Sequence, residues 1–502
     1  MAKIGFDNER YLKEQSEAIL KRIEKFQGKL YLEFGGKLLY DYHAARVLPG
    51  YDPNIKIKLL KFLKDKTDIL LCIYAEDIEK GRIRGDFGIT YDVDALKLID
   101  DLRRYDLEVL AVVITRFDNQ PQAIRFKNIL ENRNIRVYTH YATKGYPTDI
   151  DIIVSDEGYG KNPYIETRNP IVVVTGPGPG SGKLATCLSQ LYHDYKKGIK
   201  SGYAKFETFP IWNLPLKHPV NLAYEAATAD IGDFNLIDPF HLSAYNQTAV
   251  NYNRDVEVFP ILKRILEKIS GGELIYKSPT DMGVNRAGFA IVDDQAVKEA
   301  SKQELIRRYF RYNYERVLGI AKKESVEKVK LLMEEAEVSI EDRKVVLFAR
   351  EAAFKERNES KLVETSCGAA IELKNGEIVT GRNSNLMSAP SALILNAIKR
   401  LADIPDRIHL LSPEIIKRIK NLKKDILEIR QEILDLEETL ICLSISSATN
   451  PTAELAMEKL KELEFCEVHL THIPSSGDEA GLRRLRLNLT CDANFPSRDL
   501  LF

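Results

Sequence analysis

Strand-like and helix-like segments alternate through residues 1–200 of the chain. Short apolar runs rich in β-branched residues, typical of buried strands, are found at 29–34, 69–74, 108–115, 135–139, 150–155 and 171–175. Segments with the apolar spacing of helices separate several of these runs, at 55–63, 94–104 and 122–132. This alternation is typical of a mostly parallel, Rossmann-like sheet with helices on both faces, so we predict an α/β domain at 1–200.

The length of the chain, 502 residues, is too great for a single core and indicates about three domains. Beyond the first domain the alternation stops, and helical patterns become dominant. We therefore predict a mainly helical middle domain at 201–359 and a C-terminal α+β domain at 360–502.

Two local signals belong to the C-terminal domain. Asn375 and Gly376 separate two strand-like runs and predict a hairpin with a type I′ turn, in which both central residues have positive φ. Isoleucine and leucine repeat at steps of three and four through 412–440, which predicts one long helix that packs along its length. Its partner is either another helix of the same chain or a second copy, and we expect a homo-oligomer.

Charge and cysteine content exclude several classes of protein. The 73 lysines and arginines nearly balance the 74 aspartates and glutamates, so no overall field attracts a nucleic acid or an anionic membrane. No window approaches the ~18 uninterrupted apolar residues of a membrane span, and the first residues lack a secretory signal pattern. The six cysteines include no CxxC pair and are typical of reduced, buried thiols. We expect a cytoplasmic protein with neither nucleic-acid nor membrane partners.

A glycine-rich turn follows the apolar run at 171–175 and precedes a predicted helix. Glycines allow the backbone to approach an anion, the helix N-terminus offers unpaired N–H groups, and a lysine adds a full positive charge. The candidate phosphate-binding residues are Gly176, Gly178, Gly180, Ser181, Gly182 and Lys183. Pro177 replaces the first glycine of the ATPase P-loop, and Leu184 replaces the Ser or Thr that holds magnesium. We predict binding of a phosphate group; the alternatives are a magnesium-dependent NTPase and a structural turn.

Further candidates follow the strand-like runs, where ligands bind in parallel sheets. Arg82 and Arg84 lie in a glycine-containing segment that either closes over a phosphate as a lid or forms an ordinary surface loop. His43 follows the first strand-like run and is a candidate general acid or base, although a single histidine is more often structural.

A second polar group follows the run at 150–155. We expect Asp156 and Glu157 to orient the ligand or to assist proton transfer, and Tyr159 to contact the ligand. Because we place this group at the carboxyl edge of the same sheet, the sequence predicts that it lies near Lys183.

Metal and peptidase chemistry receive little support. Aspartate and glutamate are frequent at 225–241, together with His241, but their spacing matches no calcium or zinc motif, and turns use aspartate as readily. We assign no metal site and leave the cofactor unknown. No histidine is followed by glutamate, which removes the HExxH helix, and no Gly-x-Ser-x-Gly elbow occurs.

Three segments, 155–164, 176–190 and 278–285, resemble a bacterial family of uncharacterised proteins of similar length, some of which were labelled ATP-dependent peptidases. The resemblance spans nearly the whole chain. It implies an α/β N-terminal domain, a helical middle and a C-terminal unit similar in topology to cytidine deaminases, but no established reaction. A zinc deaminase needs His or Cys near a Glu and a PCxxC pair, and neither occurs around Cys367 or Cys491.

Together these patterns predict a cytoplasmic enzyme that binds a nucleotide or a phosphorylated metabolite and transfers a phosphoryl or other group. The alternative is a nonenzymatic oligomeric sensor or scaffold that uses the same turn to bind its ligand.

Overall fold

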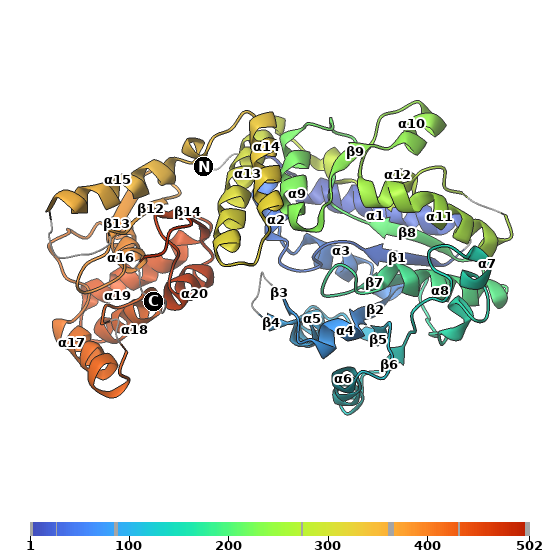
Figure 1. Cartoon of the computed structure of the whole chain (residues 1–502), viewed down its shortest axis with the longest axis horizontal. Helices are drawn as coiled ribbons and strands as arrows, with labels where there is room; N and C mark the ends of the chain where they lie inside the picture. Colours follow the sequence, from blue (N-terminus) through green and yellow to red (C-terminus); the bar gives the residue numbers. More distant parts are fainter. Residues whose placement is uncertain are drawn as a thin grey trace. The chain divides into compact units, whose positions relative to one another are not determined.

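The computed structural model describes residues 4–26, 28–84, 89–272, 275–359, 366–429 and 432–496; of Arg84 and 355–359 it describes only the backbone. The chain forms two compact units, which we call the N-terminal unit (Lys3–Ser301) and the C-terminal unit (Lys302–Phe502) (Figure 1).

A seven-stranded sheet, parallel at every pair of neighbours, forms the centre of the N-terminal unit. Its strands lie in the order β11 (Gly283–Val284), β8 (Gly202–Phe206), β1 (Leu30–Phe34), β7 (Ile171–Thr175), β2 (Thr67–Tyr74), β5 (Val109–Thr115) and β6 (Val137–Thr139). The predicted α/β class and mostly parallel sheet are confirmed. The sheet also takes β8 and β11 from the region assigned to a middle domain at 201–359, and the division into three domains stays a prediction.

Strand β7 occupies the middle of this sheet. All five of its residues are buried, as its β-branched sequence predicts. Strands β1, β2, β5 and β6 come first in the sequence. Strand β7 follows them in the sequence but lies between β1 and β2 in the sheet, and β8 lies on the other side of β1. Such a reversal of strand order leaves a crevice at the carboxyl ends of the strands, where ligands of α/β proteins bind.

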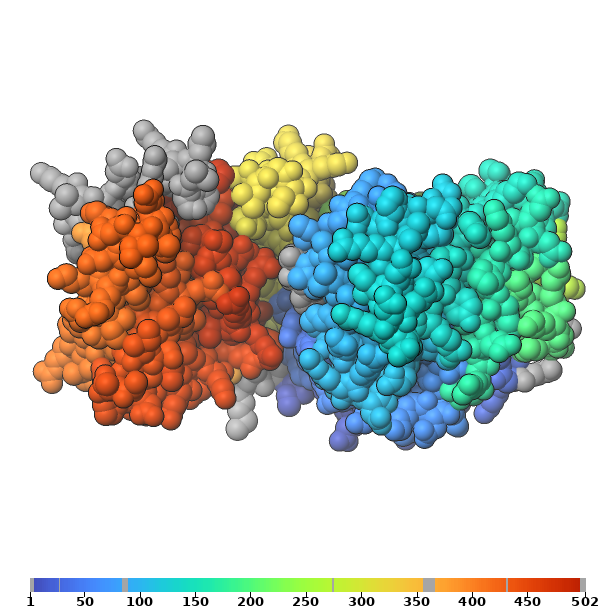
Figure 2. All heavy atoms as spheres, turned by 90° about the horizontal axis from the view of Figure 1, so that it is seen from below, coloured from blue at the N-terminus to red at the C-terminus, as the bar shows by residue number. Residues whose placement is uncertain are grey.

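Helices cover both faces of the sheet (Figure 1). On one face, α8 (Lys183–Lys196) and α11 (Asn253–Ser270) pack against side chains such as Leu70 and Val172. On the other, α4 (Ala75–Glu79), α5 (Tyr91–Arg104) and α6 (Pro121–Glu131) cover Leu71 and Ile114. Leu70 and Leu71 face opposite sides because side chains alternate along a strand. The atoms of α4, α5 and α6 are among the blue and cyan atoms in Figure 2.

Shorter elements complete the N-terminal unit. Two small antiparallel pairs are β3 (Ile83–Arg84) with β4 (Ile89–Thr90) and β9 (Asn235–Ile237) with β10 (Val250–Tyr252). The further helices are α1 (Asn8–Lys25), α2 (Tyr42–Val47), α3 (Ile55–Phe62), α7 (Ile150–Ile153), α9 (Pro219–Ala227), α10 (Pro239–Tyr245) and α12 (Pro279–Met282).

The strand predicted at 150–155 is wrong, because the chain forms the single helical turn α7 there. The side chain of Asp149 accepts a hydrogen bond from the backbone N–H of Ile152 (3.0 Å) and caps this turn. A local side-chain cap therefore overrides the β-branched composition of the segment.

The C-terminal unit combines helices with a four-stranded sheet. The strand order is β13 (Ile378–Arg382), β12 (Gly368–Glu372), β14 (Glu467–Leu470) and β15 (Asn488–Cys491). Strand β12 is antiparallel to both neighbours, whereas β14 and β15 are parallel. The helices are α13 (Asp294–Val317), which spans the boundary between the units, α14 (Lys323–Glu335), α15 (Lys344–Glu359), α16 (Ala389–Leu401), α17 (Pro413–Asn421), α18 (Leu436–Ser447), α19 (Pro451–Glu458) and α20 (Ser476–Arg484).

The hairpin predicted around Asn375 and Gly376 is present as β12 and β13, but the predicted type I′ turn is wrong. Gly376 has a φ of 85°, and Asn375 has no positive φ. Instead, the backbone N–H of Gly376 donates to the carbonyl of Leu373 (2.8 Å), so the glycine closes the turn rather than forming its centre. A longer loop with one left-handed glycine serves the same hairpin.

The single helix predicted at 412–440 is also corrected. Helix α17 continues into a π-helical turn, Leu422–Ile426, and α18 begins only at Leu436. Glu428 has a positive φ of 52°, which an α-helix does not accommodate. Asp435 then starts α18 through a capping box with Glu438. The repeat of isoleucine and leucine continues through the segment between α17 and α18, so the sequence pattern gives no sign that the helix is interrupted there.

Candidate functional site

The glycine turn, residues 176–183, leaves the carboxyl end of the central strand β7 and leads into α8. Gly182 is the N-cap of α8 and has a φ of 88°, and Gly180 has a φ of 73°. A Cβ atom at Gly178 would lie 2.4 Å from a ring carbon of Tyr91, and one at Gly182 would lie 2.7 Å from the side chain of Thr115. Close packing and positive φ therefore both require glycine here.

Side chains bind the carbonyl groups of the glycine turn. The hydroxyl of Thr115 donates to the carbonyl of Ser181 (2.8 Å), and the guanidinium of Arg116 donates to the carbonyl of Gly180. The ammonium of Lys183 folds back to the carbonyl of Gly178 (3.2 Å) and lies 3.4 Å from the hydroxyl of Ser181. These contacts hold the carbonyl oxygens and place two cations beside the turn.

The amide groups of the turn remain available. Among the described residues, the backbone N–H groups of Gly178, Gly180 and residues 182–184 have no acceptor, whereas Ser181 is buried within the turn; α8 has no side-chain cap. Pro179 and Gly180 are exposed, so a ligand can reach the turn from solvent. Unpaired N–H groups at a helix N-terminus carry partial positive charge and, with Lys183 and Arg116, form a site for an anion.

Arg82 lies close to this turn. Its guanidinium is 5.7 Å from the ring centre of Tyr91, the residue that packs against Gly178, and 3.3 Å from a carboxylate oxygen of Asp77. The structure thus brings Arg82 and the glycine turn together through Tyr91. The backbone of Arg84 lies in β3, but the predicted contact of its side chain lies outside the described residues.

The second polar group lies at the opposite end of α8. Asp156 pairs with Lys196, the last residue of α8, and accepts a hydrogen bond from Tyr192 (2.9 Å). A helix of 14 residues is about 20 Å long, so the predicted proximity of Asp156 to Lys183 is wrong. The reason is the same local error, because α7 replaces the strand that would have delivered Asp156 to the carboxyl edge.

The two neighbours of Asp156 share its position. Glu157 is exposed and pairs with Lys144, and these opposite charges hold the pKa of Glu157 below its usual value. Tyr159 is buried in the core beneath α8, where its carbonyl accepts a hydrogen bond from Ser189 (3.0 Å). Neither residue is brought to the glycine turn.

His43 lies in α2, and its ring packs edge-on against Phe209, with 5.3 Å between ring centres. Phe209 follows β8, and the neighbouring pair of Asp41 and Lys56 (2.9 Å) is buried. These neighbours indicate that His43 has a structural role in packing. The structure does not bring His43 to the glycine turn.

The acidic residues considered as metal ligands act as caps and ion-pair partners. Asp238 caps α10 and accepts a hydrogen bond from Thr280 (2.7 Å), His241 contacts Ser278 (2.9 Å), and Asp233 pairs with Arg254. Across the described ranges, no group of three or more His, Cys, Asp or Glu side chains is arranged to hold a metal ion.

A charged cluster near the carboxyl ends of β1 and β8 escaped the sequence interpretation. We call it the Lys205 cluster. The ammonium of Lys205 lies 2.8 Å from Asp255 and 2.9 Å from Glu207, and Tyr252 donates to Glu207 (2.9 Å). Glu33, on β1, lies beside it and accepts a hydrogen bond from Tyr203 (2.8 Å).

Burial raises the pKa of Glu207 to about 7, with Lys205 acting in the opposite direction and Asp255 raising it further. Burial also raises the pKa of the Cys72 thiol to about 12, and the charges of Lys183 and Glu33 act on it in opposite directions. A carboxyl group that titrates near neutral pH is suited to proton transfer.

The enclosed space at the turn is small. A cavity of about 40 Å³ is lined by Gly176 and Pro177 together with Lys37, Asp94 and Lys97. Small-molecule pockets usually enclose about 300–1,000 Å³, so this cavity does not hold a whole nucleoside. The turn itself offers a site for an anionic group, with the remainder of a ligand lying outside it.

Two family models match the chain. Residues 4–337 match "Domain of unknown function DUF1846, N-terminal", and residues 341–501 match "Domain of unknown function DUF1846, C-terminal". In the part of the chain that the structure describes, every helix is too short or too polar to cross a lipid bilayer.

Curated relatives support the same assignment over the whole length. A UPF0371 protein of Clostridium botulinum (strain Langeland / NCTC 10281 / Type F) is 61% identical over 500 residues, which cover 100% of this chain and 99% of the relative. A UPF0371 protein of Clostridium tetani (strain Massachusetts / E88) is 59% identical with the same coverage. The predicted membership of an uncharacterised bacterial family is confirmed: the chain belongs to the DUF1846 family, whose curated relatives are named UPF0371.

Proposed function

We propose that the N-terminal unit binds the phosphate group of a nucleotide or a phosphorylated metabolite at the glycine turn, and that the protein transfers a phosphoryl or other group. The observation that carries this proposal is the set of unpaired amides at Gly180 and 182–184, beside Lys183 and Arg116, at the end of the central parallel strand. Backbone N–H groups at a helix N-terminus are well suited to phosphate oxygens.

The cations beside the turn supply the charge that the phosphate needs. The ammonium of Lys183 donates to the carbonyl of Gly178, and a phosphate oxygen bound at the turn would replace that acceptor. Arg116 is exposed and can form paired hydrogen bonds to two phosphate oxygens. Leu184 lacks the hydroxyl that holds magnesium in P-loop enzymes, so the proposed binding does not include a Mg²⁺ ion held by the turn.

The Lys205 cluster favours an enzyme over a simple binding protein. Glu207 has a pKa of about 7 because of burial, which allows it to accept and release a proton at neutral pH. Lys205 and Tyr252 contact Glu207 and would orient its carboxyl group. In this proposal Glu207 replaces Asp156 and Glu157 as the candidate for proton transfer.

The alternative is a nonenzymatic oligomeric sensor or scaffold. The small cavity at the turn, about 40 Å³, supports it, because a site that grips only an anionic group can report a ligand without converting it. Turnover separates the two functions. Product formation from a metabolite mixture by the wild-type protein, but not by Glu207→Gln or Lys183→Ala, would support the enzyme; tight binding without product would support the sensor.

Binding can be tested by calorimetric titration with pyrophosphate and with ATP, without added magnesium. We expect Lys183→Ala to weaken binding about 10-fold to 100-fold, the range for losing one hydrogen bond to a charged group. Lys61→Ala, which removes an exposed lysine on α3, is the matched control and should leave affinity unchanged. Equal binding by all three proteins, or no binding by any, would rule out the glycine turn as the site.

Three further parts of the sequence interpretation belong to this proposal. We propose a cytoplasmic location, supported by six free and buried cysteines, and a homo-oligomeric assembly. We also propose a cytidine-deaminase-like topology for the C-terminal unit as a likeness of shape. The strand order β13–β12–β14–β15 supports this likeness. Strand β12 runs in one direction, and the other three strands run in the opposite direction.

A further inference from the structure

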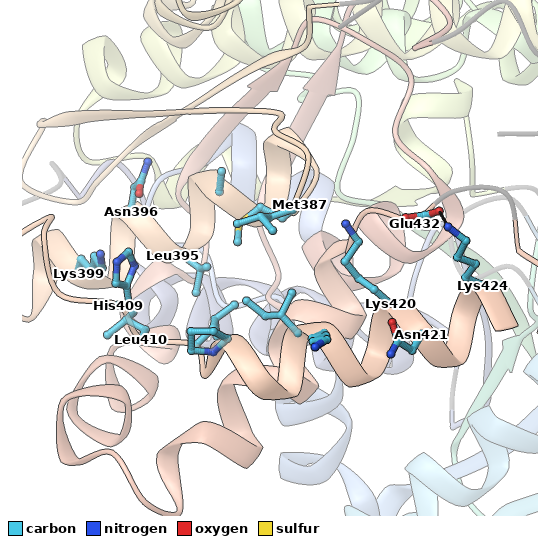
Figure 3. A pocket seen from close by; sticks show the side chains of 16 residues that line it. Met387, Leu395, Asn396, Lys399, His409, Leu410, Lys420, Asn421, Lys424 and Glu432 are labelled. Carbon is cyan, nitrogen blue, oxygen red and sulfur yellow. Dashed lines mark ion pairs between the residues drawn. The ribbon is translucent and has the colours of Figure 1, made fainter. Parts of the chain in front are cut away.

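The C-terminal unit contains a cavity of about 620 Å³ between α16, α17 and the segment that joins them. This volume falls within the range of about 300–1,000 Å³ that is usual for small-molecule pockets. Figure 3 shows the cavity with its lining side chains. It lies wholly within one unit, and no part of the proposed phosphate site contributes to it.

The middle of the cavity is apolar. Its floor includes Leu395, Leu410 and Leu411, which are 8%, 2% and 6% exposed, and Met387 and Ile416 continue the apolar lining. In Figure 3, Met387 and Leu395 lie between the two labelled groups of polar side chains, and Leu410 lies next to His409. Such a surface favours a ligand with an apolar body. Moving apolar ligand surface out of water lowers the free energy in proportion to the area that is buried.

The ends of the cavity are basic. Four lysines line it, Lys399, Lys417, Lys420 and Lys424, against one acidic residue among its described lining, Glu432. Figure 3 shows Lys399 with His409 at one end, and Lys420 and Lys424 near the other. The excess of positive charge calls for a ligand with an anionic group.

The two ends differ in how far their cations are already neutralised. Lys424 has Glu432 as a counter-ion at 3.2 Å, and the ammonium of Lys420 donates to the carbonyl of Asn385 (3.1 Å). Lys399 is half-buried and donates to the backbone carbonyl of Asp406 (2.9 Å). Burial lowers the pKa of Lys399, and the charge of the exposed Asp406 acts in the opposite direction. A ligand carboxylate beside Lys399 would add a second counter-charge at this half-buried ammonium.

From the buried apolar floor and the lysine at its end, we propose that this cavity binds a small amphiphilic anion. The ligand is of the class of medium-chain carboxylates, with its chain along Leu395 and Leu410 and its carboxylate beside Lys399. The volume of this space and its buried floor favour a molecule of this size over a flat contact with a protein or a membrane.

The proposal can be tested by calorimetric titration of the full-length protein with octanoate, decanoate and dodecanoate, below their micelle concentrations. We expect affinity to rise about fourfold with each added methylene, because each buried methylene contributes a nearly constant free energy. Decanol tests the need for the charge and should bind about fivefold more weakly than decanoate. Acetate tests the need for the chain and should show no measurable binding, because it lacks eight of the methylenes of decanoate.

Variants locate the ligand within the cavity. Lys399→Gln should weaken decanoate binding about fivefold, the upper range for a partly exposed ion pair, whereas Lys399→Arg should retain it. Lys424→Gln, at the end with its own counter-ion, and Lys461→Gln, an exposed lysine outside the cavity, are the controls. Ala392→Phe fills the space from α16 and should abolish binding, with circular dichroism confirming that the variant is folded.

Several results would overturn the proposal. Equal affinity for decanol and decanoate, no dependence on chain length, or unchanged binding by both Lys399→Gln and Ala392→Phe would each do so. So would binding to anionic phosphatidylglycerol vesicles without binding to monomeric decanoate, which would identify a membrane contact. Loss of a dimer in Ala392→Phe, without decanoate binding by the wild type, would identify a contact between copies.

Discussion

Replacement of Gly182 by alanine should destabilise the N-terminal unit more than replacement of Gly180, although both glycines have a positive φ. The backbone cost of a left-handed conformation is shared and amounts to about 1–2 kcal/mol. At Gly180 the added Cβ meets no atom within 4 Å, whereas at Gly182 it lies 2.7 Å from three side-chain atoms of Thr115. Overpacking of this kind costs about 1–3 kcal/mol more. We expect Gly182→Ala to lower the unfolding free energy by about 2–5 kcal/mol and Gly180→Ala by about 1–2 kcal/mol.

Urea unfolding followed by tryptophan fluorescence measures this difference. The chain has one tryptophan, Trp212, which lies in the N-terminal unit and donates to the carbonyl of Asn285 (2.8 Å). Its emission therefore reports that unit and not the other. Thr115→Gly should remove most of the difference between the two alanine variants. Equal destabilisation by Gly180→Ala and Gly182→Ala would refute the close packing of the turn against β5.

Three further predictions concern the Lys205 cluster and the C-terminal unit. Because the folded-state pKa of Glu207 is raised to about 7, its ionisation opposes folding, so stability should fall by up to ~3 kcal/mol as pH rises from about 4.5 to 7; Glu207→Gln should flatten this decline in urea titrations, and an unchanged pH profile would contradict the raised pKa. Leu443→Ala, at a fully buried site on α18, should cost about 2–5 kcal/mol, whereas Ile441→Ala, 58% exposed on the same helix, should cost under about 0.5 kcal/mol in thermal unfolding; similar losses would show that α18 faces the core differently. Asp435→Ala should cost about 1 kcal/mol by removing the capping box with Glu438, and a continuous helix through that position would show no loss.

Much of the N-terminal fold was predictable because buried parallel strands have a strong local signal. The run at 171–175 coincides with β7, and the run at 108–115 differs from β5 by a single residue. Strand β8 (Gly202–Phe206) was not recognised, because Lys205 interrupts its apolar pattern. The sheet accommodates this lysine because the carboxylates of Asp255 and Glu207 neutralise its charge. Neither carboxylate is part of the strand, so the sequence pattern of the strand does not reveal the pairing.

The candidate site was predictable only in part. The glycine turn lies where the sequence placed it, and its amides are unpaired among the described residues. The position of Asp156 was not predictable from composition. The segment before it forms the helical turn α7 and not a strand, because the side chain of Asp149 caps that turn. Arg116 was not among the predicted site residues, because its contact with Gly180 joins positions 64 residues apart.

The central claim is that the backbone amides of the glycine turn bind an oxyanion, and amide resonances test it most directly. The protein would be labelled with ¹⁵N-glycine and titrated with pyrophosphate, with the turn resonances assigned from Gly180→Ala and from its effect on neighbouring signals. The account predicts saturable shifts of Gly178, Gly180 and Gly182, and none for Gly232 or Gly271, which cap helices elsewhere in the unit. Saturable binding that leaves the turn resonances unmoved would contradict it.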